Sequence, residues 1–96
     1  MIVLLSVRRI ENVKIVGVVE PALLGKVYRS GNKVLDVSED FYSGEQVDLN
    51  VALDEVRTAT VATLIGNTVV EEALKQGLIA AYDEVEGVKF AQMFNM

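Results

Sequence analysis

Residues 56–78 have the sequence V-R-T-A-T-V-A-T-L-I-G-N-T-V-V-E-E-A-L-K-Q-G-L, and the fold class depends on how this segment is interpreted. We predict the end of one helix, a short break and a second helix. At about 100° per residue the apolar positions from Leu49 onward share one arc, so the first helix is predicted over Leu49–Ile65. Its last turns are apolar nearly all round. Other elements enclose such a segment, or it faces a partner subunit through Val61, Ala62 and Ile65.

The second predicted helix runs from Val69 to Gln76. Gly66 ends the first helix, because glycine adopts the left-handed cap conformation without a Cβ clash. Thr68 and Glu71 have the spacing of a capping box, and Glu71 also precedes Lys75 by four residues, the favourable order for an ion pair. Gly77 closes the helix, and Leu78 supplies the apolar contact of that cap. The segment therefore predicts a helical hairpin.

Hairpins of β-strands are predicted on both sides of this helical hairpin. Runs of β-branched and aliphatic residues separated by short turns are typical of strands, and Gly31-Asn32 is a two-residue hairpin signal. Pro21 begins a short helical turn over Ala22–Leu24 that Gly25 closes. The predicted strands are Ile2–Ile10, Val13–Val19, Lys26–Arg29, Lys33–Val37, Ile79–Val85 and Val88–Phe94. This order predicts an α+β fold, an antiparallel or mixed sheet built from hairpins with a helical hairpin packed on one face.

The segment Ser38–Asp48 has no sustained period and is predicted to be an ordered loop. Phe41 and Tyr42 lie inside this polar segment, where such residues pin a loop to the core or form a recognition surface. Asp48 or Asn50 is the expected cap of the long helix.

Length and composition predict one domain over residues 1–96. The chain is 51% hydrophobic, enough for a single core, and it has no cysteine and no histidine. It therefore lacks thiolate metal sites and the commonest general base. The N-terminal apolar run is too short to span a bilayer and precedes its charges, unlike a secretory signal, so we expect a soluble, cytoplasmic protein that does not enter a membrane.

Charge is unevenly distributed along the chain. The net charge is −5, but residues 1–33 hold six basic and two acidic side chains, a balance of +4, which leaves −9 for residues 34–96. The first third either presents one basic surface to an anion or carries ordinary solvated strand charges.

Catalytic and metal-binding motifs are not recognisable in the sequence. The serines lie outside nucleophile-elbow and S-x-x-K patterns, and Gly25-Lys26 is followed by Val27 rather than the serine or threonine of a phosphate-binding loop. Adjacent acids such as Asp54-Glu55 do not face each other on a helix. We therefore expect no cofactor, no metal site and no catalytic residues.

Four ordered blocks resemble a known family. They are Pro21-Ala-Leu-Leu-Gly-Lys26, Val37-Ser-Glu-Asp-Phe-Tyr-Ser-Gly44, Ala59-Thr-Val-Ala-Thr-Leu-Ile-Gly66 and Gly87-Val-Lys-Phe-Ala-Gln92. Together they resemble a small archaeal family of uncharacterised proteins, the domain-of-unknown-function family numbered 424. Thr63 replaces the family's usual asparagine, and Lys89-Phe90 replaces proline-histidine. The resemblance implies an archaeal, cytoplasmic protein of no established activity, with a suggested link to translation or RNA.

Three functional hypotheses follow from these patterns. The first is a non-catalytic binding module for RNA or a ribonucleoprotein, in which basic residues contact phosphates and a tyrosine stacks on a base, with affinity that falls steeply with salt. Its candidate residues are Arg8, Lys14, Lys26, Tyr28, Arg29 and Tyr42. The second is a protein-interaction or homo-oligomerisation domain that uses the apolar helix end. The third is an enzyme that uses the acidic loop around Phe41–Asp48.

Overall fold

The computed structural model describes residues 1–95, which form eight strands, three α-helices and one 3-10 turn. In chain order these elements are β1 (Ile2–Ile10), β2 (Val13–Val19), η1 (Pro21–Leu23), β3 (Val27–Ser30), β4 (Lys33–Asp36), α1 (Glu39–Tyr42), β5 (Glu45–Asp48), α2 (Leu49–Arg57), β6 (Val61–Ile65), α3 (Asn67–Lys75), β7 (Asp83–Val85) and β8 (Val88–Phe94).

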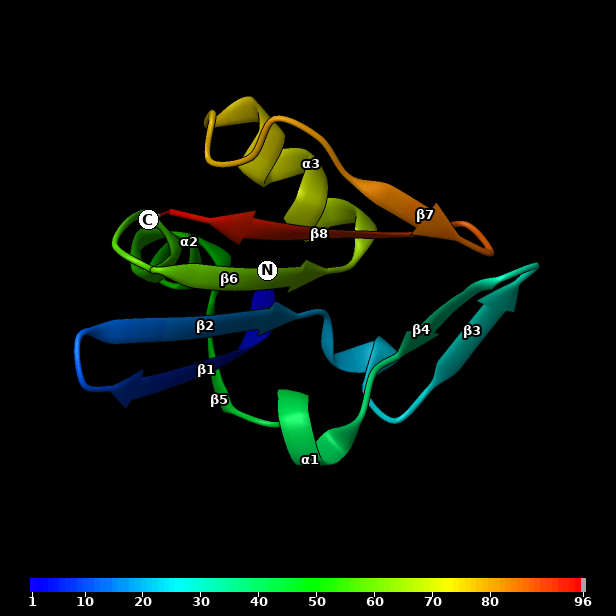
Figure 1. The fold of residues 1–96 in the computed structure, drawn as a ribbon, viewed down its shortest axis with the longest axis horizontal. Helices are drawn as coiled ribbons and strands as arrows, with labels where there is room; N and C mark the ends of the chain where they lie inside the picture. Colours follow the sequence, from blue (N-terminus) through cyan, green and yellow to red (C-terminus); the bar gives the residue numbers. More distant parts are fainter. Residues whose placement is uncertain (96) are drawn as a thin grey trace.

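Six of the strands form a mixed sheet in the order β5-β1-β2-β6-β8-β7. β2 and β6 are parallel, whereas the other neighbouring pairs of this sheet are antiparallel. β3 and β4 form a separate hairpin, which projects from one end of the long strands in Figure 1. The predicted α+β class with a mixed sheet is therefore confirmed, and so are the opening hairpin and the β3–β4 hairpin.

One face of the sheet is covered by α2 and α3. The buried side of α2 presents Leu49, Ala52, Leu53 and Val56 to the strands, as the helical spacing predicts. The Asp48 carboxylate accepts a hydrogen bond from the amide of Asn50 at 3.1 Å, which confirms Asp48 as the helix cap. These residues form the larger apolar core together with one side of β1, β2, β6 and β8.

The prediction of a helical hairpin is wrong, because a strand separates the two helices. α2 ends at Arg57, and Val61–Ile65 is the central strand β6 rather than the end of a helix. This strand pairs with β2 on one side and β8 on the other, and it is covered on both faces at its Ile65 end. A strand covered on both faces is a continuous apolar run, so it resembles a helix that is apolar all round.

The start of α3 also differs from the predicted capping box. The carboxylate of Glu20, at the end of β2, accepts hydrogen bonds from the amides of Thr68 and Val69 at 2.9 and 3.2 Å. Gly66 makes this approach possible: its φ is 127°, and an added Cβ would lie 2.1 Å from a carboxylate oxygen of Glu20. The cap is therefore supplied by a residue 48 positions away.

The other end of α3 agrees with the sequence. Gly77 has a φ of 72°, and the amide of Leu78 donates to the carbonyl of Ala73 at 2.9 Å, as a glycine cap requires. The predicted pair between Glu71 and Lys75 is replaced by an ion pair between Glu71 and Lys89 at 2.8 Å. β7 is also shorter than the predicted strand Ile79–Val85.

The predicted loop Ser38–Asp48 contains two short elements, α1 and the edge strand β5. β5 pairs with the first half of β1, and Gly44 lets the chain approach so closely that an added Cβ would lie 2.2 Å from the carbonyl oxygen of Leu5. A four-residue edge strand is too short to produce a recognisable period, which explains the error.

The second face of the sheet is covered over only part of its length. η1, the β3–β4 hairpin and α1 enclose a smaller apolar cluster that includes Val19, Ile65, Val37 and Val85. Tyr42 packs against this cluster as expected, whereas the adjacent Phe41 is 65% exposed. The opposite ends of β1, β2, β6 and β8 are left uncovered on this face.

Candidate functional site

A row of small and polar residues crosses the uncovered part of the sheet. The strand register pairs Ser6 with Gly17, Gly17 with Thr63, and Thr63 with Gln92. Directly paired residues point to the same side of a sheet, so these four positions form one line across β1, β2, β6 and β8. Their side chains lie on the face opposite to α2 and α3, because the alternate residues of the same strands belong to the larger core.

This row forms part of a surface hollow of about 290 Å³. Its lining residues come from α1 and four strands: Ser6, Arg8, Ile10, Ile15, Val16, Gly17, Phe41, Tyr42, Thr63 and Gln92. Gly17 creates space within it, since an added Cβ would lie 2.7 Å from Ser6 Oγ and 3.7 Å from a ring carbon of Tyr42. Glycine in a strand interior marks a place where another group approaches closely, and here that group includes the Tyr42 ring.

Tyr42 packs α1 against the sheet and contributes a hydroxyl to the hollow. Burial raises the pKa of Tyr42 above its usual value of 10.0, although a hydrogen bond with the Thr63 side chain acts in the opposite direction. The hydroxyl is therefore protonated at neutral pH and can donate as well as accept a hydrogen bond.

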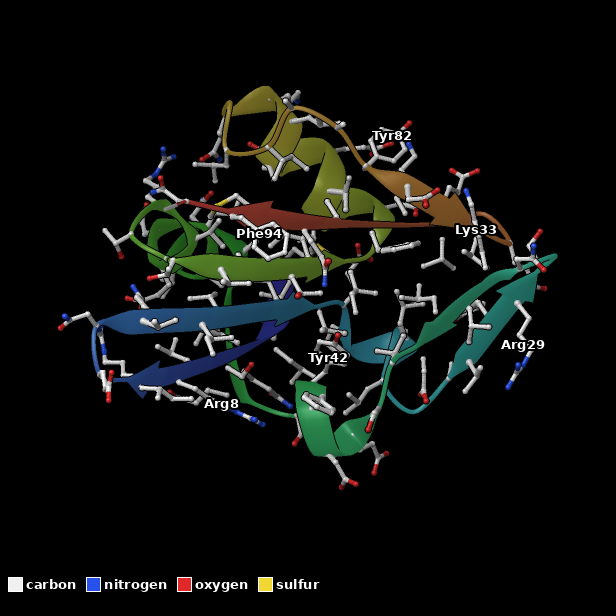
Figure 2. The ribbon with its side chains drawn as sticks, in the orientation of Figure 1. Arg8, Arg29, Lys33, Tyr42, Tyr82 and Phe94 are labelled. Carbon is white, nitrogen blue, oxygen red and sulfur yellow. The ribbon has the colours of Figure 1, made fainter. Side chains whose placement is uncertain are left out.

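Arg8 lies at the rim of the hollow, where α1 holds it. Its guanidinium carbon is 5.8 Å from the centre of the Phe41 ring, and one guanidinium nitrogen donates to the carbonyl of Asp40 at 3.4 Å. Figure 2 shows Arg8 beside α1 and below Tyr42. Arg8 is the single cationic residue that lines the hollow in the described part of the chain.

Apolar side chains continue the uncovered surface beyond the hollow. Ile10 is 62% exposed and Phe94 63% exposed, while Ile15 and Val61 are partly buried. Phe94 follows Gln92 by two residues on the same face and pairs with Val61, and Figure 2 shows its ring over β6 and β8. We use the name "open face" for the hollow residues other than Val16, together with Val13, Val61 and Phe94. The Val16 side chain belongs to the larger core.

The predicted subunit interface at Val61, Ala62 and Ile65 is wrong as a continuous surface. Ala62 and Ile65 are fully buried on opposite sides of β6, one in each core cluster. Only Val61 belongs to the open face. The exposed apolar surface therefore lies on one side of a strand rather than around the end of a helix.

Lys14 is not available to contact a phosphate, contrary to the sequence-based hypothesis. Its side chain is 8% exposed, pairs with Glu55 at 3.0 Å, and donates to the Thr58 hydroxyl. Neighbouring residues on a strand point to opposite faces, so Lys14 lies on the helix-covered side while Ile15 lies on the open face. Lys14 therefore tethers the C-terminal end of α2 to β2.

Three of the other candidates lie together on the β3–β4 region, away from the hollow. Lys26 and Arg29 are exposed, whereas Tyr28 is partly buried against the smaller core cluster. Figure 2 shows Arg29 at the far hairpin, well separated from Arg8 and Tyr42. Of the six predicted residues, only Arg8 and Tyr42 line the hollow.

The remaining polar residues of the hollow were missed from the sequence. Ser6 interrupts an apolar strand and Gly17 interrupts a valine-rich one, so each is a local irregularity in its own segment. Thr63 and Gln92 stand out in the sequence only as positions in the family pattern. Their alignment depends on strand register, which no single segment reveals.

The acidic loop does not gather a set of metal ligands in the described residues. Within residues 1–95, no group of three or more aspartate, glutamate, histidine or cysteine residues has an arrangement that could hold a metal ion. Asp48, at the end of this loop, is occupied as the cap of α2 and lies 3.5 Å from the N-terminal amine. No helix in that same part of the chain is long and apolar enough to cross a membrane.

Comparison with known proteins identifies the family. A family model described as "Protein of unknown function (DUF424)" matches residues 8–96. The chain belongs to DUF424. The match includes every residue that lines the hollow except Ser6, and the resemblance inferred from the four sequence blocks is confirmed.

A solved structure shares the fold of this DUF424 chain. It is described as "Crystal structure of an uncharacterized conserved protein from Methanopyrus kandleri", with a TM-score of 0.79, 23% sequence identity and coverage of 97% of this chain and 90% of that chain. No curated protein matches the sequence.

Proposed function

We propose that this protein is a non-catalytic, cytoplasmic binding module for single-stranded RNA, free or within a ribonucleoprotein, and that the open face is its binding site. One observation carries the proposal: Arg8 and four neutral polar side chains line a single hollow between two exposed phenylalanines. An uncovered sheet with exposed rings and hydrogen-bonding groups is a surface on which unpaired bases stack.

The two phenylalanines supply the expected stacking energy. Phe41 is 65% exposed and Phe94 63% exposed, and neither ring is needed to fill a core cluster. Stacking on an aromatic side chain contributes about 1–3 kcal/mol per base. β1 and β8 are three strand spacings apart, about 14 Å, so the surface is wide enough for a short stretch of single strand.

The charge of the surface favours bases over phosphates as the main source of affinity. Four acidic residues of the helices, Asp54, Glu55, Glu71 and Glu72, belong to the elements that cover the other face. Asp40 of α1 lies beside Arg8, however, since the Arg8 guanidinium donates to the Asp40 carbonyl, so the local field is only weakly attractive to an anion. With one phosphate contact, the slope of log K against log salt is about −0.7, much shallower than a basic surface would give.

Fluorescence polarisation with a labelled single-stranded RNA of about ten nucleotides tests this proposal, with a duplex of the same length as the comparison. Phe94→Ala should weaken binding of the single strand by about 5- to 100-fold, the equivalent of one lost stacking contact. Val51→Ala is the matched control, because Val51 is 52% exposed on α2. Failure of the single strand to bind, or equal losses in the two variants, would contradict the proposal.

Self-association through the open face is the second candidate. The exposed apolar side chains of Ile10, Phe41 and Phe94 support it, because contiguous exposed apolar surface is typical of interaction sites. Static light scattering over a range of protein concentration distinguishes the two candidates. A concentration-dependent dimer that Phe94→Asp converts to a monomer would favour self-association, whereas a monomer at every concentration would exclude it.

A further inference from the structure

The chemistry of the hollow indicates a more specific ligand than an extended single strand. Ser6 and Thr63 contribute hydroxyls, Tyr42 a protonated phenol and Gln92 a carboxamide, so one small space is lined by both donors and acceptors. None of the lining residues is acidic, and the one cation is at the rim. This set suits a neutral planar group with several polar edge atoms, joined to an anion.

The size of the hollow limits how much of such a ligand can enter. About 290 Å³ is at the lower end of the range for small-molecule sites, so the hollow suits a group of about the size of a base rather than a larger ligand. The apolar side of the space is supplied by Ile15 and the Tyr42 ring, which can pack against the flat faces of a base. Gly17 keeps the space open between them.

We infer that the hollow binds a single nucleotide, with the base beside Tyr42 and Ile15, its polar edge toward Thr63 and Gln92, and its phosphate on Arg8. This inference rests on the proposed function, since the nucleotide would be one residue of the bound RNA. It extends the proposed function, because it assigns recognition of the base to Gln92. A carboxamide can form hydrogen bonds with a base edge through its donor and its acceptor together.

A free phosphate does not match the site equally well. Arg8 is the single cation that lines the hollow in the described residues, and its guanidinium is already engaged by Phe41 and the Asp40 carbonyl. Phosphate sites normally combine several backbone amides or cations. Binding should therefore require the base, with the phosphate adding to it.

The test is an NMR titration of the isotope-labelled chain with each of the four nucleoside monophosphates and the four nucleosides. Ribose 5-phosphate and inorganic phosphate are the controls. Ligand concentrations up to about 10 mM detect dissociation constants of about 1 mM. We expect shifts of the Gly17 amide and the Gln92 side-chain amide, unequal affinities among the four bases, and tighter binding of each nucleotide than of its nucleoside.

Two variants assign the contacts. Gln92→Ala should lower nucleotide affinity about tenfold and reduce the differences among bases, because a paired donor and acceptor are lost. Arg8→Gln should abolish the difference between nucleotide and nucleoside, whereas Arg29→Gln, a matched change on β3, should leave it unchanged. Retained dispersion in the NMR spectrum of each variant shows that it is folded.

The outcomes separate this inference from the proposed function. Single-stranded RNA that binds while every mononucleotide leaves Gly17 and Gln92 unshifted would overturn the inference and leave the proposed function standing. Mononucleotides that bind while RNA does not would support the inference and overturn the proposed function. Ribose 5-phosphate that binds as tightly as the nucleotides would overturn base recognition.

Discussion

The two faces of the central sheet use alternate residues of the same strands for different purposes. On β6, Ala62 and Leu64 are fully buried beneath the helices, whereas Val61 and Thr63 lie on the open face and are only partly covered. On β2, Val16 and Val18 belong to the larger core, whereas Ile15 and Gly17 line the hollow. One face of each of these strands therefore provides stability, which leaves the other face free for recognition.

The largest expected difference in stability between the two faces concerns two neighbouring residues of β6. Leu64→Ala should lower the free energy of unfolding by about 2–5 kcal/mol, because a fully buried side chain leaves a cavity. Thr63→Ala should lower it by less than about 1.5 kcal/mol, since it trims a small, partly exposed side chain and leaves no large cavity. Urea unfolding measures both values. Equal losses would mean that the open face contributes to stability as much as the covered one.

Two basic residues of the opening hairpin give the next contrast. Lys14→Met should lower the unfolding free energy by about 1–2 kcal/mol, because it breaks a pair whose lysine is buried and whose Glu55 partner is 38% exposed. Arg8→Gln should change stability by less than about 0.5 kcal/mol, as expected for an exposed residue.

The affinity for RNA should respond to Arg8→Gln and Lys14→Met in the opposite order from stability. Arg8→Gln should weaken RNA binding, whereas Lys14→Met should leave it unchanged in the folded protein. Urea unfolding and fluorescence polarisation on the same samples provide the measurements. A loss of RNA affinity in Lys14→Met without unfolding would restore the hypothesis of a basic N-terminal surface.

The carboxylate of Glu20 caps α3, and changing it measures how much this cap stabilises the covered face. Glu20→Ala should lower the unfolding free energy by about 1 kcal/mol, because two amides at the start of the helix lose their acceptor. Glu20→Gln keeps an acceptor oxygen and should cost less. Thermal unfolding of the two variants provides the comparison, and a glutamine variant as unstable as the alanine variant would argue that the charge alone matters.

The smallest expected effect concerns Tyr42, at the border between the covered and open parts of the second face. Burial raises the pKa of Tyr42 in the folded state above the unfolded value of about 10. The folded state therefore retains this proton more strongly, and its contribution to stability is complete below pH 10 and lost as the pH rises through the folded pKa. Denaturant unfolding on both sides of pH 10 should show a steeper decline for the natural protein than for Tyr42→Phe; identical declines would contradict the assignment.

Local sequence signals predicted the elements whose contacts are local. The hairpins over Ile2–Val19 and around Gly31-Asn32, the cap at Asp48 and the glycine exit of α3 all depend on residues close in the chain. The strand Val61–Ile65 was missed because its apolar run directly follows a helical pattern, and only pairing with β2 and β8 distinguishes a strand from a helix there. The cap by Glu20 is likewise invisible to local spacing.

The candidate site was harder to predict, because it is formed by register. Ser6, Gly17, Thr63 and Gln92 are distant in sequence and carry no shared motif, yet strand pairing places them in one row. The charge of Arg8 and the aromatic ring of Tyr42 make each a candidate, but neither property indicates the hollow. The same reasoning selected Lys14, which shows that a side chain's face cannot be inferred until the covered side of the sheet is known.

A methyl-labelled NMR titration with single-stranded RNA tests directly whether the open face is the binding site. If the open face is the binding site, the methyl signals of Ile10, Ile15 and Val61 should shift, while those of Val3, Val18 and Leu64 on the covered face should remain in place. Shifts confined to Val27 and Val34 of the β3–β4 hairpin, near Arg29, would instead assign binding to that hairpin and contradict the account.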